Sequence, residues 1–220
     1  MSPVKTQREV ARRPGRPRDE RLDAAILDAA LAELSEAGYS GFSLEAVAAR
    51  AGVSKPAIYR RWPTRQHLII DTIARTLGSD PAPDTGNTRE DIITGISTLV
   101  SSFAGTVTGR VLPGLVSDLA EDPQLTQTFL DRTFRPRRAS MIRALQRGMA
   151  RGDIRPDIDV ELILDMLAAP VYYRVLFRHL PLTPQVAVEV VDLLLATLRP
   201  QATREQQSQQ DRPRRPRGTR

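Results

Sequence analysis

Apolar side chains recur along most of this chain every three or four residues, the spacing that places them on one face of an α-helix. In residues 21–37 this spacing aligns Leu22, Ile26 and Leu34, and Gly38 is expected to end the helix. Similar stripes predict further helices over residues 64–78, 89–108, 113–120, 124–150, 160–179 and 184–198. Strand-like alternation does not occur, so the pattern predicts an all-α fold.

The pattern is densest over residues 43–68, SLEAVAARAGVSKPAIYRRWPTRQHL, which predict two short amphipathic helices joined by a tight turn. Ser43 can cap the first helix, whose buried face is expected to hold Leu44, Val47 and Ala48. Gly52 allows the left-handed backbone conformation that reverses the chain. Ser54 is expected to cap the second helix. The segment therefore predicts a helix-turn-helix.

The second short helix has one face for the core and one for a partner. Ile58 and Trp62 form its buried pair, and Pro56 suits its first turn because the missing N–H needs no partner there. The other face presents cations and the Tyr59 phenol, together with backbone N–H groups at the helix start. These groups suit contacts to phosphates and to base edges in a major groove.

The same residues resemble the DNA-binding signature of the TetR family of transcriptional repressors. The resemblance rests on residues 51–54 (AGVS) and 59–65 (YRRWPTR), preceded by 36–39 (EAGY) and by Phe42 with Ser43. The chain departs from the family at Trp62, where Phe is usual, and at Arg65, where Lys is usual, but both replacements keep the bulk or the charge. The resemblance covers about the first third of the chain.

The resemblance implies a helix-turn-helix domain over residues 21–78, with the helix from residue 64 as a connector, and a helical ligand-binding and dimerisation domain over residues 88–199. It implies a homodimer that binds a pseudo-palindromic operator in double-stranded DNA and is released from it by a small-molecule effector. The DNA-contacting residues carried over are Ser43, Ser54, Lys55, Pro56, Ala57, Tyr59, Arg60 and Arg65. Lys55 and Arg60 are expected at bases, and Tyr59 and Arg65 at phosphates.

Positive charge gathers at the two ends of the chain. The net charge is +6, yet residues 67–198 hold 13 Lys and Arg against 16 Asp and Glu. Residues 1–20 are expected to form a disordered, basic, proline-punctuated arm in which Arg13 and Arg18 flank a Gly-Arg-Pro core that contains Arg16 and suits a narrow minor groove; a solubilising tail is the alternative. Residues 200–220 are expected to be a disordered basic tail.

The second domain is expected to hold a ligand pocket and the dimer interface. Pro170 within a helical pattern predicts a kink that opens space. Candidate pocket residues are Phe103, Phe129, Phe134, Met141, Met166, Tyr172, Tyr173 and Arg174, although each could be ordinary core. The apolar surplus of the last helix predicts an interface through Val186, Val190, Leu194 and Leu198.

Catalytic and metal chemistry find no support in the pattern. The chain has no cysteine, and its two histidines, His67 and His179, lack metal-ligand spacing. We therefore expect no enzyme, no metal and no cofactor. With neither a long apolar run nor a signal-peptide core, a bacterial cytoplasmic, nucleoid-associated protein is expected. Two alternatives stay open: an architectural binder of AT-rich DNA that uses the arm, and a small-molecule carrier or enzyme with a vestigial helix-turn-helix.

Overall fold

The computed structural model describes residues 20–78 and 81–200, and every regular element within these ranges is helical. The predicted all-α class is thus confirmed. Arg13, Arg16 and Arg18 of the arm, and all but the first residue of the predicted tail, lie outside the described residues. No single helix in the described ranges is long and apolar enough to cross a membrane, although the helices Thr88–Phe103 and Val107–Glu121 pass that test as a pair bent by 82°.

The first four helices form the N-terminal unit of the molecule. Their bounds are α1 (Glu20–Gly41), α2 (Leu44–Ala51), α3 (Lys55–Tyr59) and α4 (Arg65–Leu77). Gly38 does not end α1 as expected but interrupts it, with φ 70° and ψ −171°, before one more turn to Gly41. This backbone geometry favours glycine, which has no Cβ to clash.

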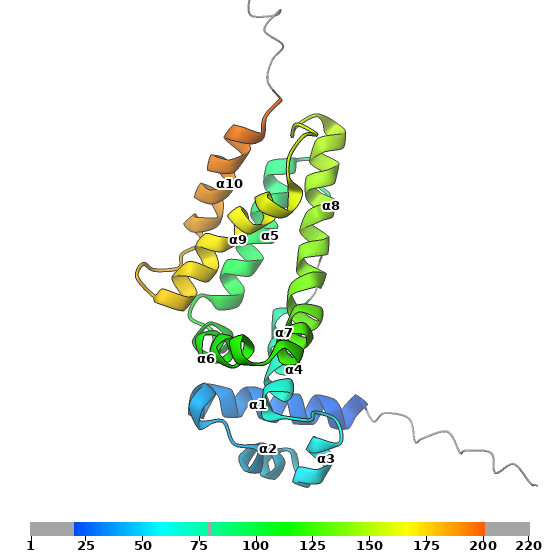
Figure 1. The fold of residues 1–220 in the computed structure, drawn as a ribbon, viewed down its shortest axis with the longest axis vertical. Helices are drawn as coiled ribbons and strands as arrows, with labels where there is room; N and C mark the ends of the chain where they lie inside the picture. The colour runs from blue at the N-terminus through cyan, green and yellow to red at the C-terminus, as the bar shows by residue number, and fades with distance from the viewer. Residues whose placement is uncertain (1–19, 79–80, 201–220) are drawn as a thin grey trace, which may run out of the picture.

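The remaining helices stand above this unit. Their bounds are α5 (Thr88–Phe103), α6 (Val107–Glu121), α7 (Pro123–Phe129), the π-helical turn η1 (Leu130–Phe134), α8 (Arg135–Arg151), α9 (Val160–Phe177) and α10 (Gln185–Leu198). Figure 1 places α1, α2 and α3 at one end of an elongated molecule and α5, α8, α9 and α10 beside one another at the other end. α6 and α7 lie between, against α1 and α4.

Two predicted boundaries around α6 are wrong. α6 starts at Val107, well before Pro113, because the Thr106 side chain accepts a hydrogen bond from the Gly109 N–H at 3.1 Å and so caps the helix earlier. Pro113 then lies inside the helix, beside the buried side chains of Leu112 and Leu115. α5 ends at Phe103 because Gly105, with φ 68°, turns the chain.

The helix predicted over residues 124–150 is divided by η1. Pro136 has no N–H to donate, and the Thr133 hydroxyl donates to the Phe129 carbonyl at 2.6 Å. The backbone between them widens, so that the Arg135 N–H bonds to the Leu130 carbonyl five residues earlier. Pro170, by contrast, lies inside α9, which is a single α-helix from Val160 to Phe177.

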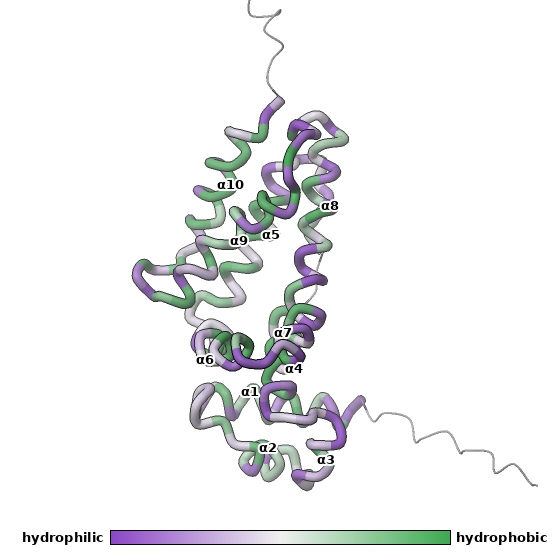
Figure 2. Tube along the Cα trace, viewed as in Figure 1, coloured by the Kyte–Doolittle hydropathy of each residue, from purple (hydrophilic) through white to green (hydrophobic). Residues whose placement is uncertain are grey.

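The described residues bury two hydrophobic cores. The N-terminal core gathers Ile26, Leu34, Val47, Ile58 and Leu68 and is joined by Val111, Leu115 and Leu125 from α6 and α7. The C-terminal core gathers Ile92, Ile96, Leu145, Leu164, Val171 and Val191. Phe129 packs against both. Figure 2 shows α10 hydrophobic along most of its length, more than one core contact requires.

Candidate nucleic-acid interface

The turn between α2 and α3 has the predicted geometry. The Ser43 side chain accepts a hydrogen bond from the Ala46 N–H at 3.4 Å and caps α2. Gly52 is left-handed, with φ 65° and ψ 32°, and the Val53 N–H reaches back to the Ala48 carbonyl at 2.9 Å. These local bonds fix where α3 starts and the direction in which it runs.

α3 is held in place both by its own buried side chain and by a residue that follows it in the chain. Ile58 is fully buried and Trp62 is 3% exposed, as predicted. The Trp62 indole N–H donates to Asp71 Oδ2 on α4 at 2.9 Å, which ties α3 to the next helix. Ser54 is the N-cap residue of α3, as predicted, although its side chain makes no capping hydrogen bond.

The outward face of α3 is open to a partner. Pro56 and Arg60 are exposed and Tyr59 is 47% exposed. Ala57, one of the predicted contacts, is only 8% exposed, because it lies on the inner side of this short helix. Its side chain therefore contributes to packing and not to the surface.

Four of the predicted DNA contacts share a single depression in the surface. It is lined by the predicted contacts Ser43, Lys55, Tyr59 and Arg65, with Phe42, Leu44, Glu45, Pro63 and Thr64 completing the wall. Thr64 caps α4 by accepting a hydrogen bond from the His67 N–H at 3.4 Å, so the positive end of the α4 dipole also opens beside it. The start of α2, the outer face of α3 and the start of α4 thus form one surface suited to a phosphate backbone.

The cations near this surface differ in whether a carboxylate pairs with them. The Lys55 ammonium is paired with Glu45, which raises the pKa of Lys55 and lowers the pKa of Glu45. Within the described part of the chain Arg60 has no ion pair, whereas Arg61 turns inward to Asp23 of α1. The sequence alone could not separate these two adjacent arginines.

A polar contact missed from the sequence braces the surface from behind. The Tyr39 hydroxyl donates to Asp118 Oδ2 on α6 at 2.5 Å, and Gln66 Nε2 on α4 donates to the same atom at 2.7 Å. The Arg65 guanidinium lies 5.4 Å from the Tyr39 ring centroid. Burial and the bond to Asp118 raise the pKa of Tyr39, while that bond lowers the pKa of Asp118. Tyr39 and Asp118 are 79 positions apart, and no local pattern links them.

A cavity of about 80 Å³ lies between α5, α8 and α9. Of the predicted pocket residues, Phe134, Met141 and Tyr172 line it, and the Phe103 ring packs against Tyr172 at 5.6 Å. Phe129 lies between the two cores instead. The structure leaves three other predicted pocket residues outside this cavity: Met166 is 45% exposed, Tyr173 is 56% exposed, and Arg174 donates to the Pro181 carbonyl at 2.8 Å. Arg137, which was not predicted, is on the cavity wall.

The predicted dimer stripe of α10 faces inward. Val186, Leu194 and Leu198 are 2%, 6% and 3% exposed, and Val190 is half-buried against the C-terminal core. These residues pack within the protomer, so the prediction chose the wrong face of an all-round apolar helix. Leu193, on the other side, is 72% exposed.

Comparisons with known proteins agree with this geometry. Residues 26–72 match the family model described as bacterial regulatory proteins, tetR family, and residues 82–194 match the tetracyclin repressor-like, C-terminal domain. The chain is 35% identical over 163 residues to the uncharacterized HTH-type transcriptional regulator YdeS of Bacillus subtilis, covering 74% of this chain and 82% of that protein. It is 32% identical to the DNA-binding transcriptional repressor TetR of Mycobacteroides abscessus, over 84% of this chain and 98% of that one. The crystal structure of the TetR family transcription regulator SCO0332 superimposes with a TM-score of 0.68 at 29% identity, covering 82% of this chain and all of the other.

Proposed function

Because the chain belongs to the tetR family of bacterial regulatory proteins, we propose that it acts as a homodimer whose two α3 helices bind one pseudo-palindromic operator. It is a DNA-binding transcriptional regulator of the helix-turn-helix type. The observation that carries the proposal is the shared surface on which Ser43, Lys55, Tyr59 and Arg65 meet.

The residues of this surface take different roles in the proposal. Lys55 and Arg60 reach base edges, because they lie at the two ends of the exposed face of α3. Tyr59, Arg65 and Ser43 hold phosphates on either side, with the capped start of α4 contributing backbone N–H groups. Ser54 and Pro56 let the backbone at the start of α3 approach the DNA.

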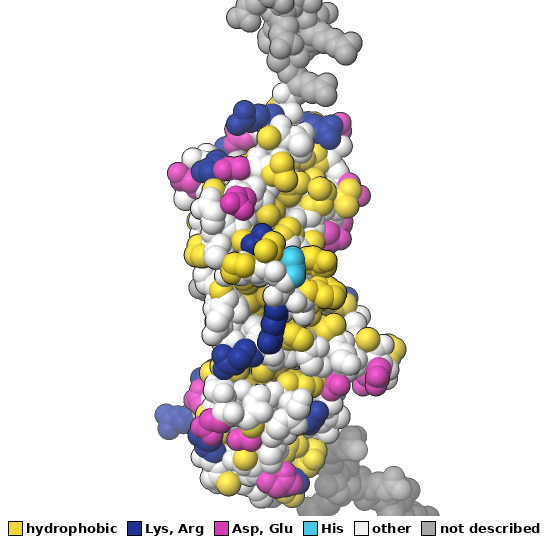
Figure 3. Space-filling model, turned by 90° about the vertical axis from the view of Figure 1, so that its left-hand side faces the viewer, with side chains coloured by type: hydrophobic (Ala, Val, Ile, Leu, Met, Phe, Trp, Pro, Cys, Tyr) yellow, Lys and Arg dark blue, Asp and Glu magenta, His cyan; other side chains and the backbone are white. Residues whose placement is uncertain are grey.

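The proposed dimer face is the outer side of α9 and α10. Leu162, Met166, Tyr173 and Phe177 lie along one side of α9 and are 55%, 45%, 56% and 67% exposed, and Leu193 of α10 is 72% exposed. Figure 3 shows hydrophobic side chains gathered over this face. Apolar patches of this kind on a folded protein mark interaction sites. A two-fold axis through it would pair each helix with its copy and set the two α3 helices about 34–36 Å apart on the DNA.

Repression and release by an effector complete the proposal. The Mycobacteroides abscessus relative is named a repressor, and we extend that role to this chain. The cavity between α5, α8 and α9 is the proposed effector site, and the cytoplasm beside the chromosome is the proposed location. The basic arm with Arg13, Arg16 and Arg18 adds nonspecific or minor-groove contacts, so deletion of residues 1–18 weakens binding without abolishing it.

A footprint of the full-length protein on the promoter region beside its own gene, repeated across salt concentrations, tests the proposal. The expected result is a protected pseudo-palindrome whose affinity falls steeply with salt. Diffuse protection that disappears when the arm is deleted would favour the architectural binder, and salt-insensitive or absent binding would contradict a DNA-reading role.

Tyr59→Ala gives a sharper test of the surface itself. Loss of the phenol is expected to weaken operator binding about fivefold or more, because a phosphate contact beside α3 is removed. The measurement is a gel-shift titration with the dimer checked by size-exclusion chromatography. Arg75→Ala is the matched control, since Arg75 is exposed on α4 and pairs with Asp28 instead of lining the depression. Equal affinity for the Tyr59 variant and the wild type would remove Tyr59 from the interface.

A further inference from the structure

The cavity between α5, α8 and α9 is apolar except at one edge. Ile96, Leu99, Met141, Leu164 and Leu167 form most of its wall. The polar groups on the lining are Tyr172 and two adjacent arginines of α8, Arg137 and Arg138. A ligand seated here therefore meets hydrocarbon on most sides and guanidinium groups at one end.

The two arginines differ in what neutralises them. Arg138 is paired with Glu161 at 2.5 Å and with Asp165 at 2.7 Å, both on α9. Arg137 has no carboxylate partner in the described ranges; its Nη2 donates to the Leu77 carbonyl at 3.1 Å and to Ser102 Oγ at 3.3 Å. Its Nη1 is shielded from solvent and has no hydrogen-bond partner there. Burial lowers the pKa of Arg137, which marks the cost of keeping this charge away from water.

An unpaired guanidinium at the wall of an apolar cavity is complementary to a ligand anion. A carboxylate matches the planar fork of arginine and would supply the missing acceptor for Nη1. From this geometry we infer that the effector is an apolar monocarboxylate, whose carboxylate pairs with Arg137 and whose hydrocarbon body lies among Ile96, Leu99 and Leu167. The inference rests on the proposed function, because it names the chemical class of the effector.

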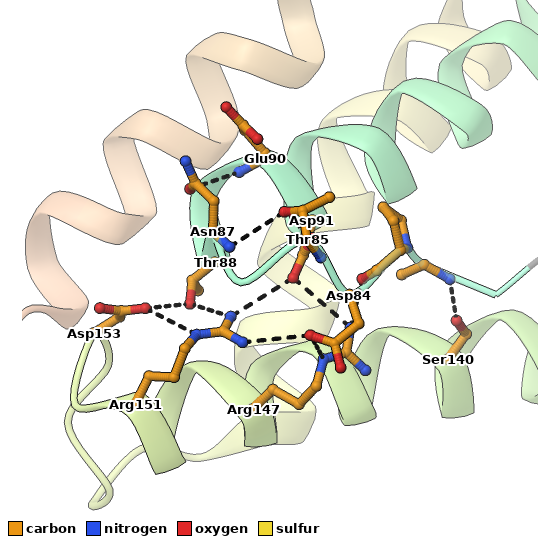
Figure 4. A network of polar contacts seen from close by, with 12 residues as sticks. Asp84, Thr85, Asn87, Thr88, Glu90, Asp91, Ser140, Arg147, Arg151 and Asp153 are labelled. Carbon is orange, nitrogen blue, oxygen red and sulfur yellow. Dashed lines mark hydrogen bonds and ion pairs between the residues drawn. The ribbon is translucent and has the colours of Figure 1, made fainter.

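Arg137 also connects this site with the DNA-reading helices. Three side chains of α8 hold the end of α4 and the residues shortly before α5: Arg137 donates to the Leu77 carbonyl, Ser140 Oγ accepts from the Ala82 N–H at 2.6 Å, and Arg147 donates to the Pro83 carbonyl at 2.6 Å. Figure 4 shows the Ser140 and Arg147 side chains, which make two of these three contacts. Leu77 is the last residue of α4, the helix that begins at Arg65.

A carboxylate that engages both Nη atoms of Arg137 competes with the Leu77 carbonyl for the same donor. Binding would therefore loosen the hold of α8 on the end of α4 while the opposite end of α4 faces DNA. The ligand would then bind more tightly when Arg137 has released the Leu77 carbonyl than when Arg137 still holds it. A ligand can shift a conformational equilibrium only through such a difference in affinity.

The free space limits the ligand unless the wall moves. A volume of about 80 Å³ holds only a few non-hydrogen atoms. Two wall residues are suited to move. Phe134 ends the π-helical turn and also borders a second depression lined by Leu130 and Ile142, and the flexible Met141 side chain occupies the space that a Cβ on residue 95 would fill if it were not glycine. A longer hydrocarbon body would extend past Phe134 into that depression.

The test compares straight-chain carboxylates with alcohols of the same length on the full-length protein. Butanoate, hexanoate and octanoate, and the corresponding 1-alkanols, are titrated by calorimetry without DNA and then in an operator-release assay. We expect one or more carboxylates to bind about tenfold or more tightly than the matching alcohol, because only the anion pairs with Arg137. The same carboxylate should release the operator.

Two variants of α8 test whether Arg137 is the residue that causes the preference for carboxylate over alcohol. Arg137→Met keeps the volume and removes the charge, so it should bind carboxylate and alcohol equally; Arg143→Met, an exposed arginine on the same helix, should retain the wild-type preference. The comparison of carboxylates with alcohols on the wild-type protein tests the inference even if a variant fails to fold. No carboxylate preference at any chain length, or a preference unchanged in Arg137→Met, would overturn the inference. Failure of the unliganded protein to bind its operator would instead overturn the proposed function, which the DNA-free titration does not depend on.

Discussion

At the scale of the residue, the surface proposed to meet DNA carries an acidic group among its cations. Glu45 accepts from Ser43 at 3.2 Å and is paired with Lys55 on α3. The Lys55 and Glu45 side chains are 40% and 67% exposed, and ion pairs with this much contact with solvent contribute little to stability. A phosphate would therefore displace Glu45 from Lys55 at small cost, yet the carboxylate would still repel the DNA backbone.

Glu45→Gln is expected to raise operator affinity about threefold, because Lys55 loses its competing partner and the surface loses a negative charge. Fluorescence anisotropy across salt concentrations measures this change. Glu36→Gln is the control, since Glu36 pairs with Arg50 and not with a residue of the depression. Unchanged or weaker affinity for the Glu45 variant would indicate that Lys55 does not approach phosphate or base.

At the scale of the element, the start of α5 depends on a buried carboxylate. Asp91 is fully buried; it accepts from the Thr85 N–H at 2.9 Å and hydroxyl at 2.8 Å and lies within 4 Å of Arg147 and Arg151 (Figure 4). Burial alone would raise the pKa of Asp91, but the Thr85 hydrogen bonds and the two arginines together hold it below the ordinary value. This network anchors Thr85 against the first turn of α5.

Asp91→Asn is expected to lower the free energy of unfolding by about 2 kcal/mol at neutral pH, because it removes the buried anion near Arg147 and Arg151 and leaves them only the more exposed Asp84 and Asp153. A lowered folded-state pKa contributes stability above the unfolded pKa of about 3.9 and loses it as the pH falls through the folded value. The difference from wild type should thus shrink in acid. Urea unfolding at neutral and at low pH measures it, with Glu90→Gln as the exposed neighbouring control; a pH-independent difference would contradict the charge-based explanation.

The elements that the sequence could predict are those fixed by contacts between residues close together in the chain. The Ser43 cap, the Gly52 turn and the Ile58–Trp62 pair involve residues close in the chain, so composition and spacing predicted α2, the turn and α3. The contacts of Arg137 with Leu77 and of Tyr39 with Asp118 join residues 60 and 79 positions apart, and no spacing rule finds them.

The inward face of α10 was predicted wrongly for a related reason. Val186 and Leu194 face the core while Leu193 faces outward, and all three are equally apolar in the sequence. Only the packing of α5 and α9 against α10 decides which side of the helix remains free.

At the scale of the whole molecule, the proposed dimer face on α9 and α10 would decide how two DNA-reading surfaces are combined. On α9, Tyr173 and Phe177 lie with their ring centroids 4.9 Å apart, and the His179 ring follows at 4.6 Å from Tyr173. A cluster of exposed rings at the end of a helix suits the desolvated centre of an interface. A dimer formed there would bind DNA with two linked surfaces.

Phe177→Glu is expected to convert the dimer to a monomer, because it places a charge in the proposed interface. The monomer should stay folded, because the Phe177 side chain is 67% exposed in the protomer. Operator affinity should then fall about a hundredfold, as expected when two linked binding events become one. Sedimentation velocity and gel shift measure the two effects. Val116→Glu, at an exposed apolar residue of α6, is the control; a Phe177 variant that stays dimeric would place the interface elsewhere.

The participation of Val111, Leu115 and Leu125 in the N-terminal core has a consequence for cooperativity. A chain cut after α4 would lack three members of its own hydrophobic centre, although it would contain the whole helix-turn-helix. Phe129 touches both cores, so neither can lose its packing without exposing a side chain of the other. We expect hydrogen exchange in α1 and α5 to proceed through one shared global opening rather than two separate ones.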